Sequence, residues 1–155
     1  MTVKKQRLYL IRNNAVVEEF VISTAVNGVG NKMDSEQTPT GLHSLEKMIG
    51  EGVPENGIFI NRVFNGDLAQ VNLSKTPSPG DMVTGRILWL KGEEEGVNNG
   101  GQVDSYSRNI YIHGTPDAGL LGMPASHGCI RMSNKDVVNL FKQMRKGDYV
   151  IILNN

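Results

Sequence analysis

Short apolar segments recur along most of the chain, and they predict β-strands; Val17, Phe20 and Ile22 give partial alternation within one of them. Gln6–Ile11 and Ala15–Ala25 flank the pair Asn13-Asn14 and together predict a hairpin. Clusters of glycine, proline and asparagine separate the apolar segments, as in folds with many tight turns. Further strands are expected, in chain order, over Gly41–Leu45, Ile58–Phe64, Arg86–Leu90, Arg108–His113 and Tyr149–Leu153.

One segment near the C-terminus has helical periodicity instead. Ser133 or Asn134 can cap its start and Gly147 suits its end, so we expect a helix near 134–146. A second, shorter helix is expected around Glu46–Met48. The apolar positions of the main helix recur every three or four residues, at Val137, Leu140, Phe141 and Met144.

The composition of two segments predicts loops on the surface. Asn65–Gly80 contains prolines that no helix interior tolerates, and Lys91–Ser105 is rich in glycine, acidic and polar residues. Either loop is a candidate lid over a site.

Length and charge narrow the class of protein. The 155 residues are expected to form one domain, 1–155. The 16 basic and 16 acidic residues balance, and no run of lysine or arginine exceeds two, so we expect no nucleic-acid partner. No apolar stretch approaches the roughly 20 residues of a membrane span. The sequence does not indicate an oligomeric state.

The N-terminal segment bears on location. Its only apolar run, Leu8–Ile11, is too short for the core of a secretory signal. The expectation is therefore a cytoplasmic protein as the chain stands, or one of the periplasm or cell envelope if a signal was removed.

The single cysteine, Cys129, is the main candidate for chemistry, and it excludes an internal disulfide. A thiol needs a nearby base to become a nucleophile, and two histidines are available. If the segment is extended, His127 projects to the same face as Cys129. His113 reaches the thiol only if the intervening loop folds back. The backbone N–H groups of Gly128 and Cys129 are a candidate oxyanion hole.

A zinc site made by His113, His127 and Cys129 is an alternative to this nucleophile. The spacing of two between His127 and Cys129 is less typical of zinc ligands, and no second cysteine exists. We therefore expect no metal and no cofactor. A third histidine, His43, has no partner nearby in sequence and is interpreted as structural.

The motif His113, then Ser126-His127-Gly128-Cys129, resembles the signature of the L,D-transpeptidase (YkuD-type) catalytic domain family. The likeness extends to Leu88–Leu90 and Ser107–Gly114, and it covers nearly the whole chain. This resemblance implies a mainly β fold, a β-sandwich of mixed sheets with one or two helices.

The resemblance also implies an activity. Such enzymes attack a peptidoglycan stem tetrapeptide, expel D-alanine and pass the thioacyl group to an amine. Cys129 would be the nucleophile, His113 the general base oriented by the Gly114 carbonyl, and His127 a neighbour lining the site. The remaining candidates contact substrate or brace the site, and these are Tyr111, Ser126 and Arg131.

Two other functions stay open at this point. An L,D-carboxypeptidase would give the thioester to water and trim soluble muropeptides. A non-catalytic peptidoglycan-binding domain is the third possibility, and the presence of Cys129, His113 and His127 argues against it.

Overall fold

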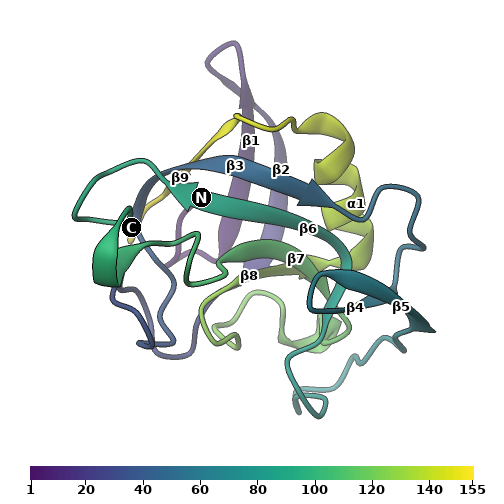
Figure 1. Ribbon diagram of the computed structural model, residues 1–155. Coiled ribbons are helices and arrows are strands. Elements are labelled where there is room, and N and C mark those ends of the chain that lie inside the picture. The colour runs from purple at the N-terminus through teal and green to yellow at the C-terminus, as the bar shows by residue number, and fades with distance from the viewer.

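Nine strands and one α-helix form the framework in a computed structural model that describes residues 1–155 (Figure 1). Two single-turn 3₁₀ helices, Gly101–Val103 and Ala118–Leu120, lie in connections. The strands are β1 (Arg7–Arg12), β2 (Ala15–Ser23), β3 (Gly41–Ile49), β4 (Gly57–Ile60), β5 (Val63–Leu68), β6 (Val83–Gly92), β7 (Tyr111–Thr115), β8 (Ile130–Ser133) and β9 (Tyr149–Ile152). The helix, α1, is Asn134–Gln143.

One mixed sheet links all nine strands. The order is β1-β2-β8-β7-β6-β3-β9, and β4 pairs with both β5 and β6. Every pair is antiparallel except β7 with β8. The sheet curls until its ends almost meet, because Thr2 bridges both Arg7 and Leu153. Figure 1 shows the result, with β1 and β2 standing behind β3 and β6.

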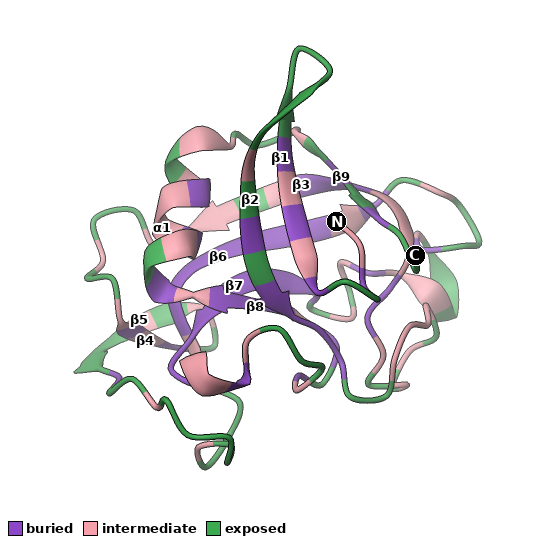
Figure 2. Ribbon diagram, turned by 180° about the vertical axis from the view of Figure 1, so that it is seen from behind, coloured by how far each residue is buried: buried purple, intermediate pink, exposed green.

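The hydrophobic core lies inside this curl, and Figure 2 shows that β6, β7 and β8 are buried along most of their length. Central strands are buried almost throughout, as for Ile87–Leu90 in β6, whereas β1 alternates between buried and partly exposed positions. This alternation is the period of two of a strand with one face on the core. The largest buried contributors come from nearly every element: Leu8, Phe20, Ile22, Leu45, Leu88, Leu90, Ile112, Ile130, Met132, Leu140 and Ile152.

The predicted helix is confirmed. The Ser133 hydroxyl accepts a hydrogen bond from the Asp136 backbone N–H at 3.0 Å, which is the expected cap. Val137 and Leu140 are buried against β6, β7 and β8. The helix ends at Gln143, a few residues earlier than expected. It is neither long nor apolar enough to cross a membrane.

Two local predictions are wrong. Glu46–Met48 is not helical but continues β3, because Lys47 and Met48 pair with Trp89 and Leu88 of β6 across a bulge. The expected strand Ile58–Phe64 is instead a hairpin of β4 and β5 that turns at Asn61 and Arg62. Both turn residues have positive φ, 49° and 70°, so the chain reverses where an uninterrupted strand was expected.

The mainly β fold of mixed strands is confirmed, with one helix. The sandwich takes the form of a single sheet curled over its own core. The hairpin at Asn13-Asn14 is also confirmed, with φ of 50° and 60° at the two residues.

Candidate active site

The parallel pair β7–β8 brings the two candidate segments together. Ile112 lies opposite Ile130, and His113 lies opposite Arg131. Alternate residues of a strand face opposite sides, and directly paired residues share a side. His113 and Arg131 therefore share one face, and Cys129, two residues before Arg131, projects to it as well. Ile112 and Ile130 point the other way, into the core. The fold-back that His113 required is present.

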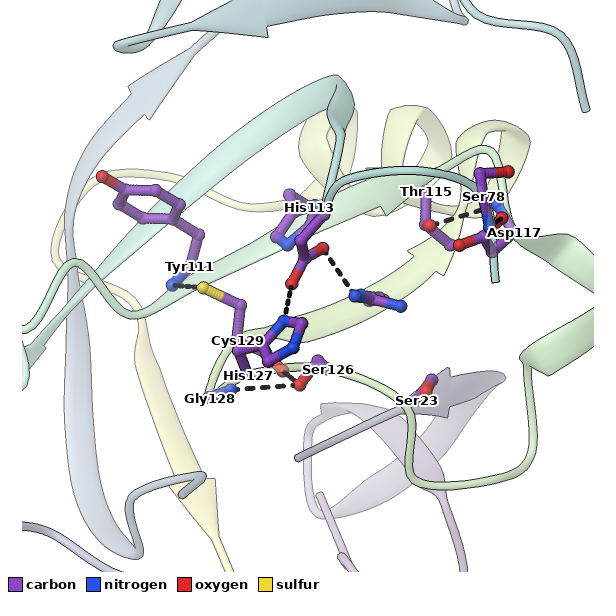
Figure 3. A network of polar contacts seen from close by, with 12 residues as sticks. Ser23, Ser78, Tyr111, His113, Thr115, Asp117, Ser126, His127, Gly128 and Cys129 are labelled. Atoms are coloured by element: carbon purple, nitrogen blue, oxygen red, sulfur yellow. Dashed lines mark hydrogen bonds and ion pairs between the residues drawn. The ribbon is translucent and has the colours of Figure 1, made fainter. Parts of the chain in front are cut away.

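Cys129 immediately precedes β8, with its side chain half-buried on this outer face (Figure 3). The Tyr111 backbone N–H donates to Sγ at 3.4 Å, and the thiol donates to the Asn109 carbonyl at 3.4 Å. Burial raises the pKa of the Cys129 thiol to about 12, although the Tyr111 N–H acts in the opposite direction. The resting thiol is therefore protonated at neutral pH.

His113 is fully buried and held in one orientation. Its Nδ1 lies 2.8 Å from the Gly114 carbonyl oxygen, so Nδ1 carries the proton and Nε2 is left to accept one. Burial lowers the pKa of His113, against the raising effect of Asp81. A neutral imidazole with a free Nε2 has the protonation state that a general base needs.

Gly114 is required by its surroundings. A Cβ built there would clash with Asn134 Oδ1 and with the Thr84 carbonyl oxygen, so no side chain fits without a shift. The Gly114 carbonyl is the group that contacts His113, as the resemblance implied.

His127 is exposed at the edge of the site and does not contact the thiol. Its Nδ1 lies 3.0 Å from Asp81 Oδ2. Arg131 is 3% exposed, and its Nη2 lies 2.6 Å from Asp81 Oδ1. Asp81 thus joins the two side chains, and the buried Arg131 is engaged inside the protein. Arg131 Nε and Nη1 have no partner.

Asp81 is a site residue that the sequence did not indicate. Burial opposes ionisation of its carboxyl, but Arg131, His113 and His127 together outweigh this, and the pKa of Asp81 lies below its ordinary value. Asp81 lies two residues before β6 and directly follows Asn65–Gly80, the first candidate lid. Buried Asp117, after β7, ties down that segment by accepting from Asn72 Nδ2 and the Ser78 N–H at 3.2 and 3.0 Å. No local signal in the sequence links Asp81 to Cys129.

The turn before Cys129 is braced by hydroxyl groups. The Ser126 hydroxyl donates to the Cys129 carbonyl at 2.6 Å and accepts from the Gly128 N–H at 3.3 Å, which accounts for its burial without any substrate. Thr38 Oγ1 donates to the Gly128 carbonyl at 3.0 Å. Gly128 has φ of 134°, a value that other residues rarely adopt.

Of the two backbone N–H groups expected to form an oxyanion hole, only that of Cys129 is free. The Gly128 N–H points at the Ser126 hydroxyl, whereas the Cys129 N–H has no partner. Such a free donor beside a thiol can stabilise a developing oxyanion.

The structure also defines the surroundings of two further residues named from the sequence, Tyr111 and His43. Tyr111 is 7% exposed, and its hydroxyl donates to Asn109 Oδ1 at 3.1 Å and accepts from Arg62 at 3.0 Å. His43 is fully buried, with ring nitrogens 3.1 Å from the Gly41 carbonyl and 2.9 Å from the Ser105 hydroxyl. The surroundings of His43 fit its structural interpretation. No group of three or more His, Cys, Asp or Glu side chains is arranged to hold a metal ion.

Comparison with known proteins gives one family. A model described as the L,D-transpeptidase catalytic domain (YkuD) matches residues 2–152. No curated protein matches the chain.

Solved structures of L,D-transpeptidases share the fold. One from Mycobacterium tuberculosis has a TM-score of 0.58 and 16% identity, covering 99% of this chain and 55% of its own. Another, L,D-transpeptidase 3 of that organism in complex with a faropenem-derived adduct, has a TM-score of 0.55 and 16% identity, with 99% and 58% covered. A cysteine-to-serine mutant from Enterococcus faecium has a TM-score of 0.57 and 15% identity, with 98% and 47% covered. The chain thus spans about half the length of these structures.

Proposed function

The chain belongs to the L,D-transpeptidase catalytic domain family, and from this premise we propose that it is a cysteine acyltransferase acting on peptidoglycan tetrapeptide stems. Cys129 is the nucleophile and His113 the general base. The observation that carries the proposal is the shared outer face of β7 and β8. On that face, the partly exposed thiol of Cys129, directly before β8, lies beside the neutral imidazole of His113 on β7. The Gly114 carbonyl fixes Nδ1 of this imidazole.

The protonation states favour general-base catalysis over a thiolate–imidazolium pair at rest. A thiol with a pKa raised to about 12 keeps its proton at neutral pH, and burial keeps His113 neutral. Proton transfer from Sγ to His113 Nε2 therefore accompanies attack on the substrate carbonyl.

Acylation proceeds through a tetrahedral intermediate. Sγ bonds to the carbonyl carbon of the third stem residue, and the carbonyl oxygen becomes an oxyanion that the free Cys129 N–H stabilises. The carbon–nitrogen bond to D-alanine then breaks. His113 gives its proton to the leaving amine, and a thioester remains on Cys129.

Deacylation reverses these roles. An acceptor amine loses its proton to His113 and attacks the thioester. The new amide leaves, Sγ takes the proton back, and the resting enzyme is restored. With water as acceptor the same steps release a tripeptide acid.

We assign a supporting role to the cluster of His127, Asp81 and Arg131. The Asp81 carboxylate holds His127 at the edge of the site and neutralises Arg131 beneath it. Arg131 is thereby a scaffold for the site, because the guanidinium is buried under Asp81. His127 is left exposed beside the nucleophile, where a bound stem peptide would pass.

The test of function is product analysis by mass. The protein is incubated with a disaccharide tetrapeptide, with and without an added amine acceptor. Cross-linked dimers or amine adducts would support transfer, and tripeptide alone would narrow the enzyme to an L,D-carboxypeptidase. Unchanged substrate would overturn the proposal and leave a binding domain.

Carbapenem acylation offers a second test. One matching structure is described as an L,D-transpeptidase in complex with imipenem. We expect imipenem to add its mass to this protein and the adduct to map to Cys129, since no other thiol is present. A Cys129→Ala variant that gained the same mass would contradict this assignment.

A further inference from the structure

Beside the thiol, on the same outer face, three aromatic rings form an aromatic platform made of Trp89, Tyr106 and Tyr111. Trp89 and Tyr106 stack with ring centroids 4.3 Å apart, and Tyr111 meets Trp89 edge-on at 5.3 Å. The platform carries two cations. The Arg62 guanidinium carbon lies 4.9 Å from the Trp89 ring centroid, and Lys47 Nζ lies 5.3 Å from it.

Neither cation has an acidic partner. Every ion pair in the structure involves other residues. The polar contacts of Arg62 are neutral, with the Tyr111 hydroxyl at 3.0 Å and Asn109 Oδ1 at 3.4 Å. Arg131, also on this face, is neutralised by Asp81. The platform thus presents two uncompensated positive charges, and a guanidinium held this way suits a carboxylate.

The same two residues that hold Arg62 also hold the nucleophile. Asn109 contacts Arg62 through its side chain and the thiol through its carbonyl oxygen. Tyr111 contacts Arg62 through its hydroxyl and the thiol through its backbone N–H. A carboxylate bound to Arg62 is therefore linked to the thiol through Asn109 and Tyr111 alone, which suits a group close to the carbonyl that Cys129 attacks.

The β4–β5 hairpin fixes the position of Arg62. Arg62 occupies the turn with φ of 70°, next to Asn61 with φ of 49°. Burial raises the pKa of the Tyr111 phenol, and this keeps its hydroxyl protonated as a donor to Asn109 while it accepts from Arg62. The hairpin thus holds the guanidinium against β7 by contacts that leave its charge free.

We propose that Arg62, assisted by Lys47, binds a carboxylate of the acyl donor next to the reacting carbonyl, namely a free α-carboxylate on the second stem residue, which precedes the residue that Cys129 attacks. This inference rests on the proposed function, because it takes the stem peptide as the donor. It makes Arg62 a specificity residue that favours a stem with the free acid over one with the amide.

The test is a binding measurement, so that it does not depend on turnover. Isothermal titration uses the Cys129→Ala protein and three tetrapeptides. The first has a free α-carboxylate at the second residue and diaminopimelate at the third. The second has a carboxamide in place of that α-carboxylate, and the third has lysine in place of diaminopimelate. Arg62→Gln is compared with Arg145→Gln, a control at an exposed arginine in the turn after α1 whose side chain makes no polar contact.

We expect the free acid to bind at least about tenfold tighter than the amide, in line with a charged hydrogen bond. Arg62→Gln should reduce this preference to about threefold or less, and Lys47→Gln should reduce it by a smaller factor. Arg145→Gln should keep it. Loss of binding with the lysine peptide instead would place the recognised carboxylate on the third residue.

Besides loss of binding with the lysine peptide, three outcomes would overturn the inference. These are equal binding of acid and amide, equal weakening of both by Arg62→Gln, and no binding of either peptide at millimolar concentration. Failure of the proposed function is a different result, since it would appear as absent turnover in the protein that retains Cys129, whatever the binding preference.

Discussion

β7 and β8 carry two faces of opposite chemistry, although their residues alternate one by one along the same strands. The inner face holds Ile112 and Ile130, each at most 1% exposed in the core. The outer face holds His113 and Arg131, with Cys129 just before β8. The inner side chains gain free energy by packing, about 1.5–3 kcal/mol for each large apolar residue. The outer polar groups carry costs, since burial opposes the charged forms of Asp81, His113 and Cys129. Packing on the inner face thus offsets the free-energy cost of burying ionisable groups on the outer face of the same strands.

The largest effect should come from the nucleophile. Cys129→Ala should reduce D-alanine release from a tetrapeptide by about 10⁴-fold or more. Its unfolding free energy should change by no more than about 1 kcal/mol, because the side chain is only half-buried. Turnover assays and urea unfolding of the same preparation measure both. Turnover retained in this variant would remove Cys129 from the mechanism.

The second largest effect on turnover is expected from His113, the general base. His113→Ala should lower kcat/KM by at least about 10²-fold, since no other imidazole is fixed by the Gly114 carbonyl. His43→Gln is the matched control, because His43 is equally buried but lies outside the outer face. The control should lose stability and keep most of its turnover per folded molecule. Comparable losses of turnover in both variants would make His113 structural.

The inner face should respond in the opposite way. Ile130→Ala should cost about 2–5 kcal/mol of unfolding free energy, because it opens a cavity in the core. Ile151→Ala, at a position 51% exposed on β9, should cost far less. Urea unfolding followed by circular dichroism gives both values. Similar costs for the two variants would contradict the distinction between the faces.

Asp81 should give the smallest and most diagnostic effect. Asp81→Asn keeps a hydrogen-bond acceptor for Arg131 and removes the charge, so we expect about a tenfold loss of kcat/KM. The negative charge raises the pKa of both His113 and Cys129. Without it both pKa values fall. His113 then remains neutral to lower pH, and the acidic limb of the kcat/KM profile should move to lower pH.

The same substitution should speed alkylation of Cys129 by iodoacetamide at a given pH, because a lower thiol pKa gives more thiolate. Asp67→Asn, on exposed β5, is the control and should shift neither readout. An acidic limb that stays in place, or alkylation that slows, would contradict the role given to Asp81.

Much of this architecture was predictable where the signal is local. Asn13-Asn14 marks a hairpin because both residues tolerate positive φ, and Ser133 marks a helix start because its hydroxyl caps the Asp136 N–H. Each of these signals lies within a few residues of the structure that it specifies.

Features decided by distant contacts were not predictable. Glu46–Met48 becomes a strand because β6 offers it a partner, which outweighs local preference. Asp81 reaches the site because Asp117 anchors its segment, and Arg62 reaches the platform because the chain turns at Asn61. In the sequence these residues look like ordinary charged loop positions. Only the curled sheet shows which of them meet.

The central claim is that the Cys129 sulfur becomes acylated by the stem peptide during turnover. The most direct test quenches a reaction with tetrapeptide in acid and weighs the intact protein. The account predicts a species heavier by the donor minus D-alanine, mapped to Cys129 and accumulating least when His113 is replaced by alanine. Release of D-alanine with no such species, or with the Cys129→Ala protein, would contradict it.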